Sequence, residues 1–317
     1  MEDPGIRLVT KVARLYHIHG LRQTEIAERL GISQSRVSRL LQQAEEARII
    51  RTVVAVPSHI HADLEDALEK QYHLTEAHVI DLVGRSDSEQ IQDLGAAAAS
   101  IFNETSLEAP QIGWTSWSRT LRAMVDRLLP VHLGTKRVIE MLGDIGPPDL
   151  QHDAARATAQ LASLCGAEPV FLRAPGIVPS PAIAQALIAQ DTFTRHALDM
   201  LDSLDIALLS FGAVDPSEPY APGRNFFTHK QLAEVKKAGA VGEICLRYID
   251  EDGKPVRSPL DDVTIGVTLE QLRNAKQRWA VVGGSYKVQA LRAALRGGWI
   301  DVLVTDVDTA TALMKNP

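Results

Sequence analysis

The stretch GWTSWSRTL, residues 113–121, marks a place where a strand turns into a helix. The apolar segment APQI precedes it at 109–112, and its last residue, Leu121, begins a series of apolar residues at helical spacing that continues with Met124, Val125 and Leu128. Hydroxyl side chains, two tryptophans and an arginine fall at the turn itself. Hydroxyls and free N–H groups at the start of a helix suit an anion, because several donors and the positive end of the helix dipole converge there. The stretch therefore predicts a β–α unit whose turn holds a substrate or a signal.

The alternation of strands and helices continues through residues 57–317. Apolar runs typical of strands start at positions 77, 109, 136, 168, 205, 240, 263, 278 and 301, with helical stretches between most of them. Such alternation favours a parallel sheet covered by helices on both faces. Asp252 and Gly253 form a hairpin turn signal, which predicts an antiparallel excursion near 247–266. We therefore expect an α/β, Rossmann-like domain over 57–317 that binds an effector and carries the oligomer contacts.

Four loops of this domain are candidates for ligand binding, because ligands of open α/β sheets bind beyond the carboxyl ends of the strands. They are GWTSWSRTL, MLGDIGPP at 141–148, SFGAVDP at 210–216 with GEIC at 242–245, and VVGGSYK at 281–287. In the last, two glycines precede a helix that carries a lysine in its first turn. The predicted effector-binding residues are Gly113, Thr115, Ser116, Trp117, Ser118, Asp144, Gly212, Glu243 and Lys287.

Several of these side chains have two interpretations. Trp114 and Trp117 fit a hydrophobic core at least as well as a platform for a ligand. A lysine near a helix N-terminus opposes the dipole by about 0.3–1 kcal/mol, a cost that an anionic ligand would offset. A solvated Lys287 is the alternative. Asp144 and Glu243 can clamp ligand hydroxyls or act as general bases, and the sequence does not distinguish these roles.

Other chemistry finds little support in the sequence. GGSYK lacks the spacing of a P-loop, no GxGxxG follows the first strand, and no nucleophile elbow occurs, so we expect no nucleotide cofactor and no catalytic residues. The HxH pairs at 17–19 and 59–61 lack companion ligands, so we expect no metal site. Cys165 and Cys245 lie far apart without a CxxC motif, which favours buried free thiols.

Charge is divided unevenly along the chain. Its 317 residues have a net charge of −7, and the 45% that are hydrophobic can build two domains with sizeable cores. Residues 1–56 hold nine Lys and Arg against six Asp and Glu, a net charge of +3, whereas the remainder holds 24 against 34, a net charge of −10. The N-terminal segment is thus suited to approach a polyanion. No apolar run approaches the roughly 20 residues of a membrane span and no signal-peptide pattern occurs, so we expect a cytoplasmic protein without a membrane partner.

The segment QTEIAERLGISQSRVSRLLQQAEEARI, residues 23–49, reads as two helices around a tight turn. Ala27 is small where two crossing helices approach closely, and Gly31 can adopt the positive φ of a sharp turn. Ser33 can cap the second helix. A preceding helix near 5–19 completes the three-helix core of a helix-turn-helix domain.

The outward face of the second helix presents donors suited to major-groove base edges and to phosphates. The predicted DNA-binding residues are Gln34, Ser35, Arg36, Ser38, Arg39 and Gln42. Any small helical hairpin with exposed arginines is the alternative. The local positive charge favours DNA binding, as does the β-branched alternation of ARIIRTVVAV at 47–56, which suits a strand or wing. We therefore predict a winged helix-turn-helix domain over 1–56 with double-stranded DNA as its partner.

The order of these segments resembles the SorC family of bacterial sugar-responsive transcriptional regulators along essentially the whole chain. The resemblance is carried by the helix-turn-helix, GWTSWSRTL, LRAPGIVPSP, DIALLSFGAVDP, GAVGEICLRYIDEDGKPV and LRGGWIDVLVTDVDTATALM. It implies an effector domain of the phosphosugar isomerase type that binds a sugar, polyol or sugar phosphate and alters operator binding, as a homodimer or homotetramer. It also implies that Gly113, Thr115, Ser116, Asp144, Glu243 and Lys287 lie on the ligand-contacting loops.

The chain departs from the family pattern at two places. Ser118 stands where the family often has glycine, and EMLGDIG has no lysine at the strand end where some members carry one, which argues against Schiff-base capture of an aldehyde. We predict an effector-controlled transcriptional regulator of carbohydrate metabolism rather than an enzyme. The alternative is a sugar-phosphate isomerase-like enzyme with an appended DNA-binding module, because a fold does not decide function.

Overall fold

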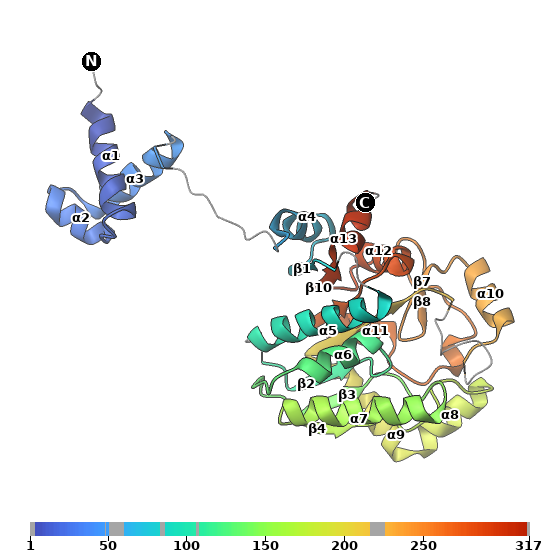
Figure 1. Cartoon of the computed structure of the whole chain (residues 1–317). Coiled ribbons are helices and arrows are strands. Elements are labelled where there is room, and N and C mark those ends of the chain that lie inside the picture. The colour runs from blue at the N-terminus through green and yellow to red at the C-terminus, as the bar shows by residue number, and fades with distance from the viewer. Residues whose placement is uncertain are drawn as a thin grey trace. The chain divides into compact units, whose positions relative to one another are not determined.

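The computed structural model describes residues 4–47, 49–50, 60–82, 86–105, 108–215 and 226–315. The chain forms two compact units, Met1–Pro57 and Ser58–Pro317 (Figure 1). Residues 51–56 of the predicted wing lie outside the described residues.

The N-terminal unit is a three-helix bundle. Its helices are α1 (Pro4–His17), α2 (Gln23–Leu30) and α3 (Gln34–Glu46). Gly31 has a φ of 64°, and the Ser33 side chain accepts a hydrogen bond from the Arg36 N–H, so the turn and the cap are as predicted. The buried apolar side chains that hold the helices together are Val12, Leu15, Ile26, Ala27, Val37 and Leu41. The predicted helix-turn-helix is therefore confirmed.

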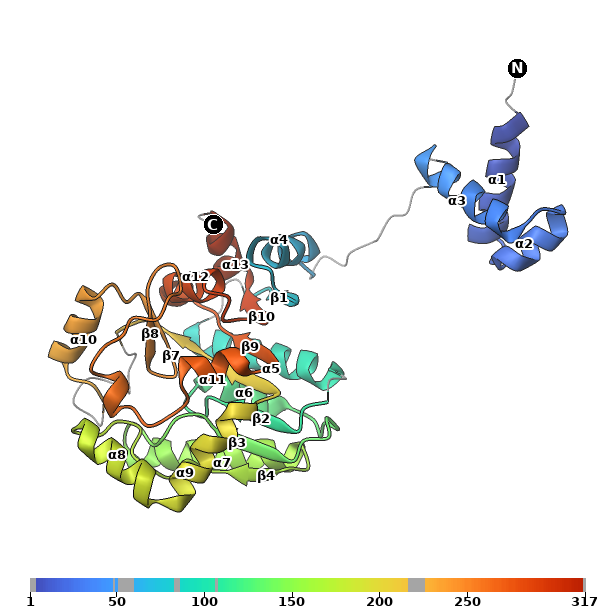
Figure 2. The same ribbon diagram turned by 180° about the vertical axis from the view of Figure 1, so that it is seen from behind.

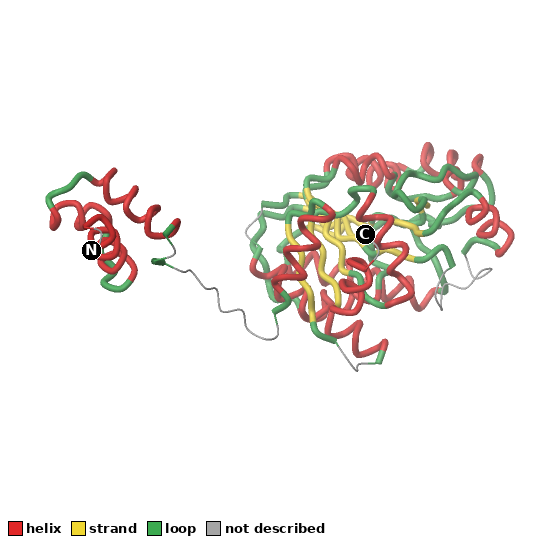
Figure 3. The backbone as a smooth tube through the Cα atoms, turned by 90° about the horizontal axis from the view of Figure 1, so that it is seen from above, coloured by secondary structure: helices red, strands yellow, loops and turns green. Residues whose placement is uncertain are grey.

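The larger unit is built on a parallel sheet, whose strands are yellow in Figure 3. Its seven strands lie in the order β1, β10, β9, β5, β2, β3 and β4. The strands are β1 (Glu76–Ile80), β2 (Gln111–Trp114), β3 (Arg137–Glu140), β4 (Glu168–Val170), β5 (Ile206–Leu209), β9 (Gln277–Val281) and β10 (Val302–Asp306). This arrangement confirms the predicted α/β class.

Helices cover both faces of this sheet. The described helices of the larger unit are α4 (Ala62–Tyr72), α5 (Asp87–Glu104), α6 (Arg119–Arg127), α7 (Pro148–Leu164), α8 (Pro181–Gln190), α9 (Thr192–Met200), α10 (His229–Lys237), α11 (Leu269–Asn274), α12 (Val288–Arg296) and α13 (Val307–Lys315). Alternate strand residues enter different cores: Ile206 and Leu208 of β5 pack with α5, α6 and α7, whereas Ala207 and Leu209 pack with α4, α12 and α13. Among the described helices, none is both long and apolar enough to cross a membrane.

A small antiparallel sheet lies beside the main one, formed by β6 (Phe211–Gly212), β7 (Gly242–Ile244) and β8 (Arg247–Ile249). The single strand predicted from position 240 is wrong, because Cys245 and Leu246 adopt left-handed φ values of 52° and 62° and turn the chain into a hairpin. An antiparallel bridge between Ile249 and Pro255 confirms the start of the excursion predicted near 247–266.

The strand predicted from position 263 is also wrong. Thr264 and Gly266 form isolated antiparallel bridges to two different segments, at Ile177 and Leu142. The buried guanidinium of Arg247 donates to the carbonyls of Thr264 at 3.2 Å and Gly266 at 3.4 Å. An apolar run that bonds to two segments and to an arginine has no continuous ladder with one partner strand.

The strand order reverses between β2 and β5. From β2 the chain proceeds outward through β3 to β4, and it then returns to the other side of β2 and proceeds through β5, β9 and β10. Figure 2 shows the helices that join these strands from the side opposite to Figure 1. At such a reversal the loops at the carboxyl ends of the strands separate and leave a crevice for a ligand.

Candidate functional sites

The first candidate site is the exposed face of α3. All six predicted DNA-binding residues are exposed, while Val37, Leu41 and Ala44 turn inward. The Arg39 Nε donates to the Ser35 carbonyl at 3.4 Å, and the Gln42 Nε2 donates to the Glu46 Oε1 at 3.2 Å. The face therefore offers donors on a rigid helix, as base and phosphate contacts in a major groove require.

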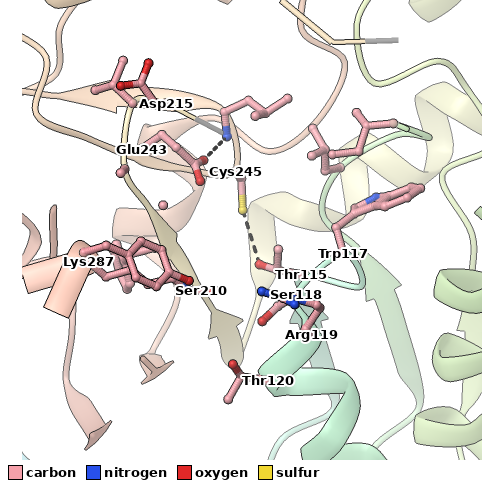
Figure 4. Close-up of a pocket in the computed structure, with 18 of the residues that line it drawn as sticks. Thr115, Trp117, Ser118, Arg119, Thr120, Ser210, Asp215, Glu243, Cys245 and Lys287 are labelled. Atoms are coloured by element: carbon pink, nitrogen blue, oxygen red, sulfur yellow. Dashed lines mark hydrogen bonds between the residues drawn. The ribbon is translucent and has the colours of Figure 1, made fainter. Parts of the chain in front are cut away.

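The second candidate site is a cavity at the carboxyl ends of β2 and β5 (Figure 4). Its volume of about 150 Å³ is room for on the order of ten water molecules, and hence for a small metabolite. Polar side chains from three loops line it, and apolar side chains close it, among them Leu142, Ile145, Val214 and Tyr248.

The first wall is the junction of β2 and α6. Ser118 is the N-cap of α6, and its Oγ accepts from the Leu121 N–H at 3.2 Å. Arg119 and Thr120 begin α6, so their N–H groups have no carbonyl of an earlier helical turn to donate to. These N–H groups are therefore available to a ligand. The Thr115 Oγ1 lies 3.3 Å from the Leu208 carbonyl that accepts from it, which ties β2 to β5 at the base of the cavity.

The second wall is the pairing of β6 with β7. Gly212 lies opposite Glu243, and a Cβ added at Gly212 would approach the Glu243 Oε1 to 2.2 Å. The glycine therefore makes room for the carboxyl group, which also accepts from the Leu246 N–H at 2.7 Å. Burial raises the pKa of Glu243 to about 7, against the lowering effects of the Leu246 N–H and of Lys287.

The third wall is the loop between β9 and α12. The buried Asp306 accepts from the Gly284 N–H at 3.0 Å and from the Thr309 N–H at 2.8 Å, which fixes the loop to the end of β10. Lys287 ends the 3₁₀ turn η3 (Ser285–Lys287) and is the N-cap residue of α12. It therefore lies just before the first turn of α12, whereas the sequence predicted it within that turn. Burial lowers the pKa of Lys287, Glu243 raises it, and Arg119 lowers it.

Figure 4 shows Glu243 and Lys287 on one side of the cavity and the β2–α6 junction on the other. Two cationic side chains, Arg119 and Lys287, thus line the same cavity as the N–H groups at the start of α6. A carboxyl group stands beside them. Such a set can bind an anionic group and accept hydrogen bonds from hydroxyl groups of the same ligand.

The cavity brings together six of the nine predicted effector-binding residues: Thr115, Trp117, Ser118, Gly212, Glu243 and Lys287. Gly113, Ser116 and Asp144 are not among its lining residues. A Cβ at Gly113 would lie 2.7 Å from the Leu204 side chain and 2.9 Å from the Met141 sulfur, so this glycine allows close packing inside the sheet. Asp144 forms an ion pair with Arg173 at 3.3 Å.

Other lining residues are not in the predicted set, among them Arg119, Ser210, Cys245 and Tyr286, which lie in the four predicted loops, and Tyr248, which does not. The position of Arg119 just after the N-cap could have identified it, because first-turn side chains lie beside the free N–H groups. Cys245 lines the cavity because it lies in the turn between β7 and β8, a hairpin that was not predicted from the sequence. Trp114 is fully buried in the core, whereas Trp117 is both a core residue and part of the lining.

Other reactive groups are few in the described part of the chain. It contains no group of His, Cys, Asp and Glu residues that could hold a metal ion. Cys165 and Cys245 are free and buried, as predicted, and burial raises their thiol pKa values to about 11 and about 12. Neither thiol is therefore a ready nucleophile near neutral pH.

Known proteins share this organisation. Residues 57–315 match the family described as "Putative sugar-binding domain", and residues 13–59 match the MarR family. The deoxyribonucleoside regulator of Bacillus subtilis is 31% identical over 317 residues, 100% of both chains. The chain belongs to the SorC family.

The SorC sorbitol operon regulator of Klebsiella pneumoniae is 28% identical over 316 residues, 98% of both chains. Its full-length crystal structure matches with a TM-score of 0.73 and 26% identity over 98% of this chain and 100% of that one. As a SorC-family member with these two domains, the chain is an effector-controlled, DNA-binding transcriptional regulator.

Proposed function

We propose that the cavity at the carboxyl ends of β2 and β5 binds a sugar, polyol or sugar phosphate, and that its occupancy changes the affinity for operator DNA. The observation that carries this proposal is that Lys287, Arg119 and Glu243 line one cavity together with the start of α6. The cations and N–H groups suit a phosphate, and the carboxyl group suits sugar hydroxyls. Two relatives are named the deoxyribonucleoside regulator and the sorbitol operon regulator, and these names support this ligand class.

We assign DNA binding to residues 1–56 and effector binding and oligomer formation to 57–317. A single helix-turn-helix reads a short half-site, so a homodimer or homotetramer is required to place two recognition helices about 34–36 Å apart along DNA, or at a multiple of that spacing. The protein acts in the cytoplasm, where its operator is, and it does so without catalysis.

A second candidate function follows from Glu243. A carboxyl group with a pKa of about 7 is suited to proton transfer near neutral pH, and Lys287 stands beside it. An isomerase acting on a sugar phosphate would use such a pair. Turnover of a sugar phosphate that is lost in Glu243→Gln would establish this function, whereas binding without turnover supports the regulator alone.

The test begins with DNA that the protein selects from a random pool, labelled for fluorescence anisotropy. Sorbitol, a deoxyribonucleoside, and pentose and hexose phosphates with their unphosphorylated parents are then added in turn. Coupling between two sites of one regulator is of order 1–3 kcal/mol, so at least one ligand should change the Kd for DNA by about 5- to 150-fold. The proposal fails if the effective ligand changes the Kd for DNA as strongly in the Lys287→Ala and Glu243→Gln variants as in the wild-type protein.

A further inference from the structure

Helix α8 has an unusual composition for a helix at the surface. None of its ten residues, PAIAQALIAQ, is Asp, Glu, Lys or Arg, although residues 57–317 carry a net charge of −10. Helices at a protein surface ordinarily present charged residues to water. Figures 1 and 2 both show α8 and α9 at the periphery of the larger unit.

Large apolar side chains are exposed on the same two helices. Ile183 of α8 is 43% exposed and Phe193 of α9 is 82% exposed. Ala182, Ala186 and Ala189 of α8 are exposed as well. We call these five residues the α8–α9 surface. An exposed phenylalanine beside an uncharged helix is the composition of an interface core, from which charged residues are depleted and in which aromatic residues are enriched.

We propose that the α8–α9 surface is the contact between two copies of this chain. The proposal rests on the proposed function, in which two recognition helices must reach two half-sites. Two units of net charge −10 repel each other, and this repulsion is smallest where an uncharged surface meets its own copy. A two-fold contact uses the same residues on both copies, which suits these five uncharged side chains. Helix α9 also carries the exposed Arg195, whose guanidinium donates to the Ala189 carbonyl at 3.1 Å.

The same helices are connected to the effector cavity. Ala184 of α8 and Ala197 of α9 belong to one hydrophobic cluster with residues that line the cavity, namely Trp117, Leu142, Ile145, Val214 and Tyr248. Packed cores transmit displacements between rigid elements because they deform little. A ligand that shifts the cavity wall therefore displaces the α8–α9 surface and with it the spacing of the two DNA-binding units.

Cross-linking tests the contact directly in the full-length protein. Ile183→Cys and Ala186→Cys variants are treated with a short bis-maleimide, and Leu129→Cys is the matched control, because Leu129 is 65% exposed and lies outside the α8–α9 surface. The native thiols are buried and give no background. We expect a covalent dimer for the two α8 variants and none for the control. A dimer from Leu129→Cys alone, or from no variant, overturns the proposal.

A second measurement tests whether charged residues introduced into the α8–α9 surface separate the two copies. Ile183→Asp with Phe193→Asp adds two exposed carboxylates to each copy, and we expect the mass measured by light scattering to halve, while Leu129→Asp leaves it unchanged. An unchanged mass for the double variant overturns the contact but leaves assembly itself standing. A wild-type protein that is monomeric both free and on DNA contradicts the proposed function as well. Circular dichroism confirms that each variant keeps its helices.

Discussion

The recognition helix and the effector cavity place their charged groups in opposite surroundings. Arg36 and Arg39 on α3 are exposed, so water and salt compete for them until DNA arrives. Glu243 and Lys287 stand in the cavity, where burial raises the pKa of the first to about 7 and lowers that of the second. The exposed pair contributes to DNA affinity as two of the many contacts that a protein makes with a long polyanion. The cavity, in contrast, must select one small molecule with only a few charged and polar side chains.

The largest effect is expected at the exposed pair. An arginine that reads a base contributes about 1–3 kcal/mol, so Arg36→Ala combined with Arg39→Ala should weaken operator binding by about two to four orders of magnitude. Anisotropy at physiological salt measures this loss. Lys230→Ala with Lys237→Ala, which removes two exposed cations from α10, is the control for net charge. Equal losses in both double variants would mean that α3 does not read DNA.

The next effect is expected in the cavity and should depend on the ligand. Charge-assisted hydrogen bonds contribute about 1.5–3 kcal/mol, so Lys287→Ala should weaken a phosphorylated effector about tenfold to a hundredfold and affect its unphosphorylated parent much less. DNA affinity without effector should stay the same. Calorimetry measures the ligand, with Lys237→Ala as the control. If a neutral polyol proves to be the effector and its Kd is the same for Lys287→Ala as for the wild-type protein, the cavity binds hydroxyls and not phosphate.

A steric prediction concerns the glycine opposite Glu243. Gly212→Ala places a Cβ 2.2 Å from the Glu243 Oε1, and overpacking of this kind costs about 1–3 kcal/mol. Urea unfolding should show this loss in the wild-type background and little of it in a Glu243→Ala background, because the clash is then absent. A loss that is equal in both backgrounds would assign the role of Gly212 to the backbone.

The smallest effect is expected from pH. The folded pKa of Glu243, about 7, lies above its unfolded value, so the folded state binds more protons between pH 4.5 and pH 7. Stability from this group is thus lost as the pH rises through 7. Glu243→Gln should be more stable than wild type at pH 8 by on the order of 1 kcal/mol, after allowance for solvent screening, and equal to it at pH 4. A constant difference at every pH would contradict this account.

The sequence predicts the elements of both regions better than their contacts. The recognition helix follows from local signals, since the turn at Gly31 and the cap at Ser33 depend on neighbouring residues. The cavity depends on pairings between distant segments. Gly212 has no room for a side chain because the Glu243 carboxyl group lies against it. The run from position 263 is not a strand, and Arg247 donates hydrogen bonds to two of its carbonyls. Neither relation leaves a periodic pattern in the sequence.

The proposed regulation requires that ligand binding in the cavity and DNA binding by the recognition helix are energetically linked. Linkage is reciprocal, so the factor by which an effector changes the Kd for DNA must equal the factor by which DNA changes the Kd for that effector. Calorimetric titration of the effector into the protein, free and saturated with its selected DNA, measures the second factor directly. We predict a change of about 5- to 150-fold that matches the first factor and disappears in Arg36→Ala with Arg39→Ala. An effector that binds with the same Kd in the presence and absence of DNA would show that the two sites are not linked.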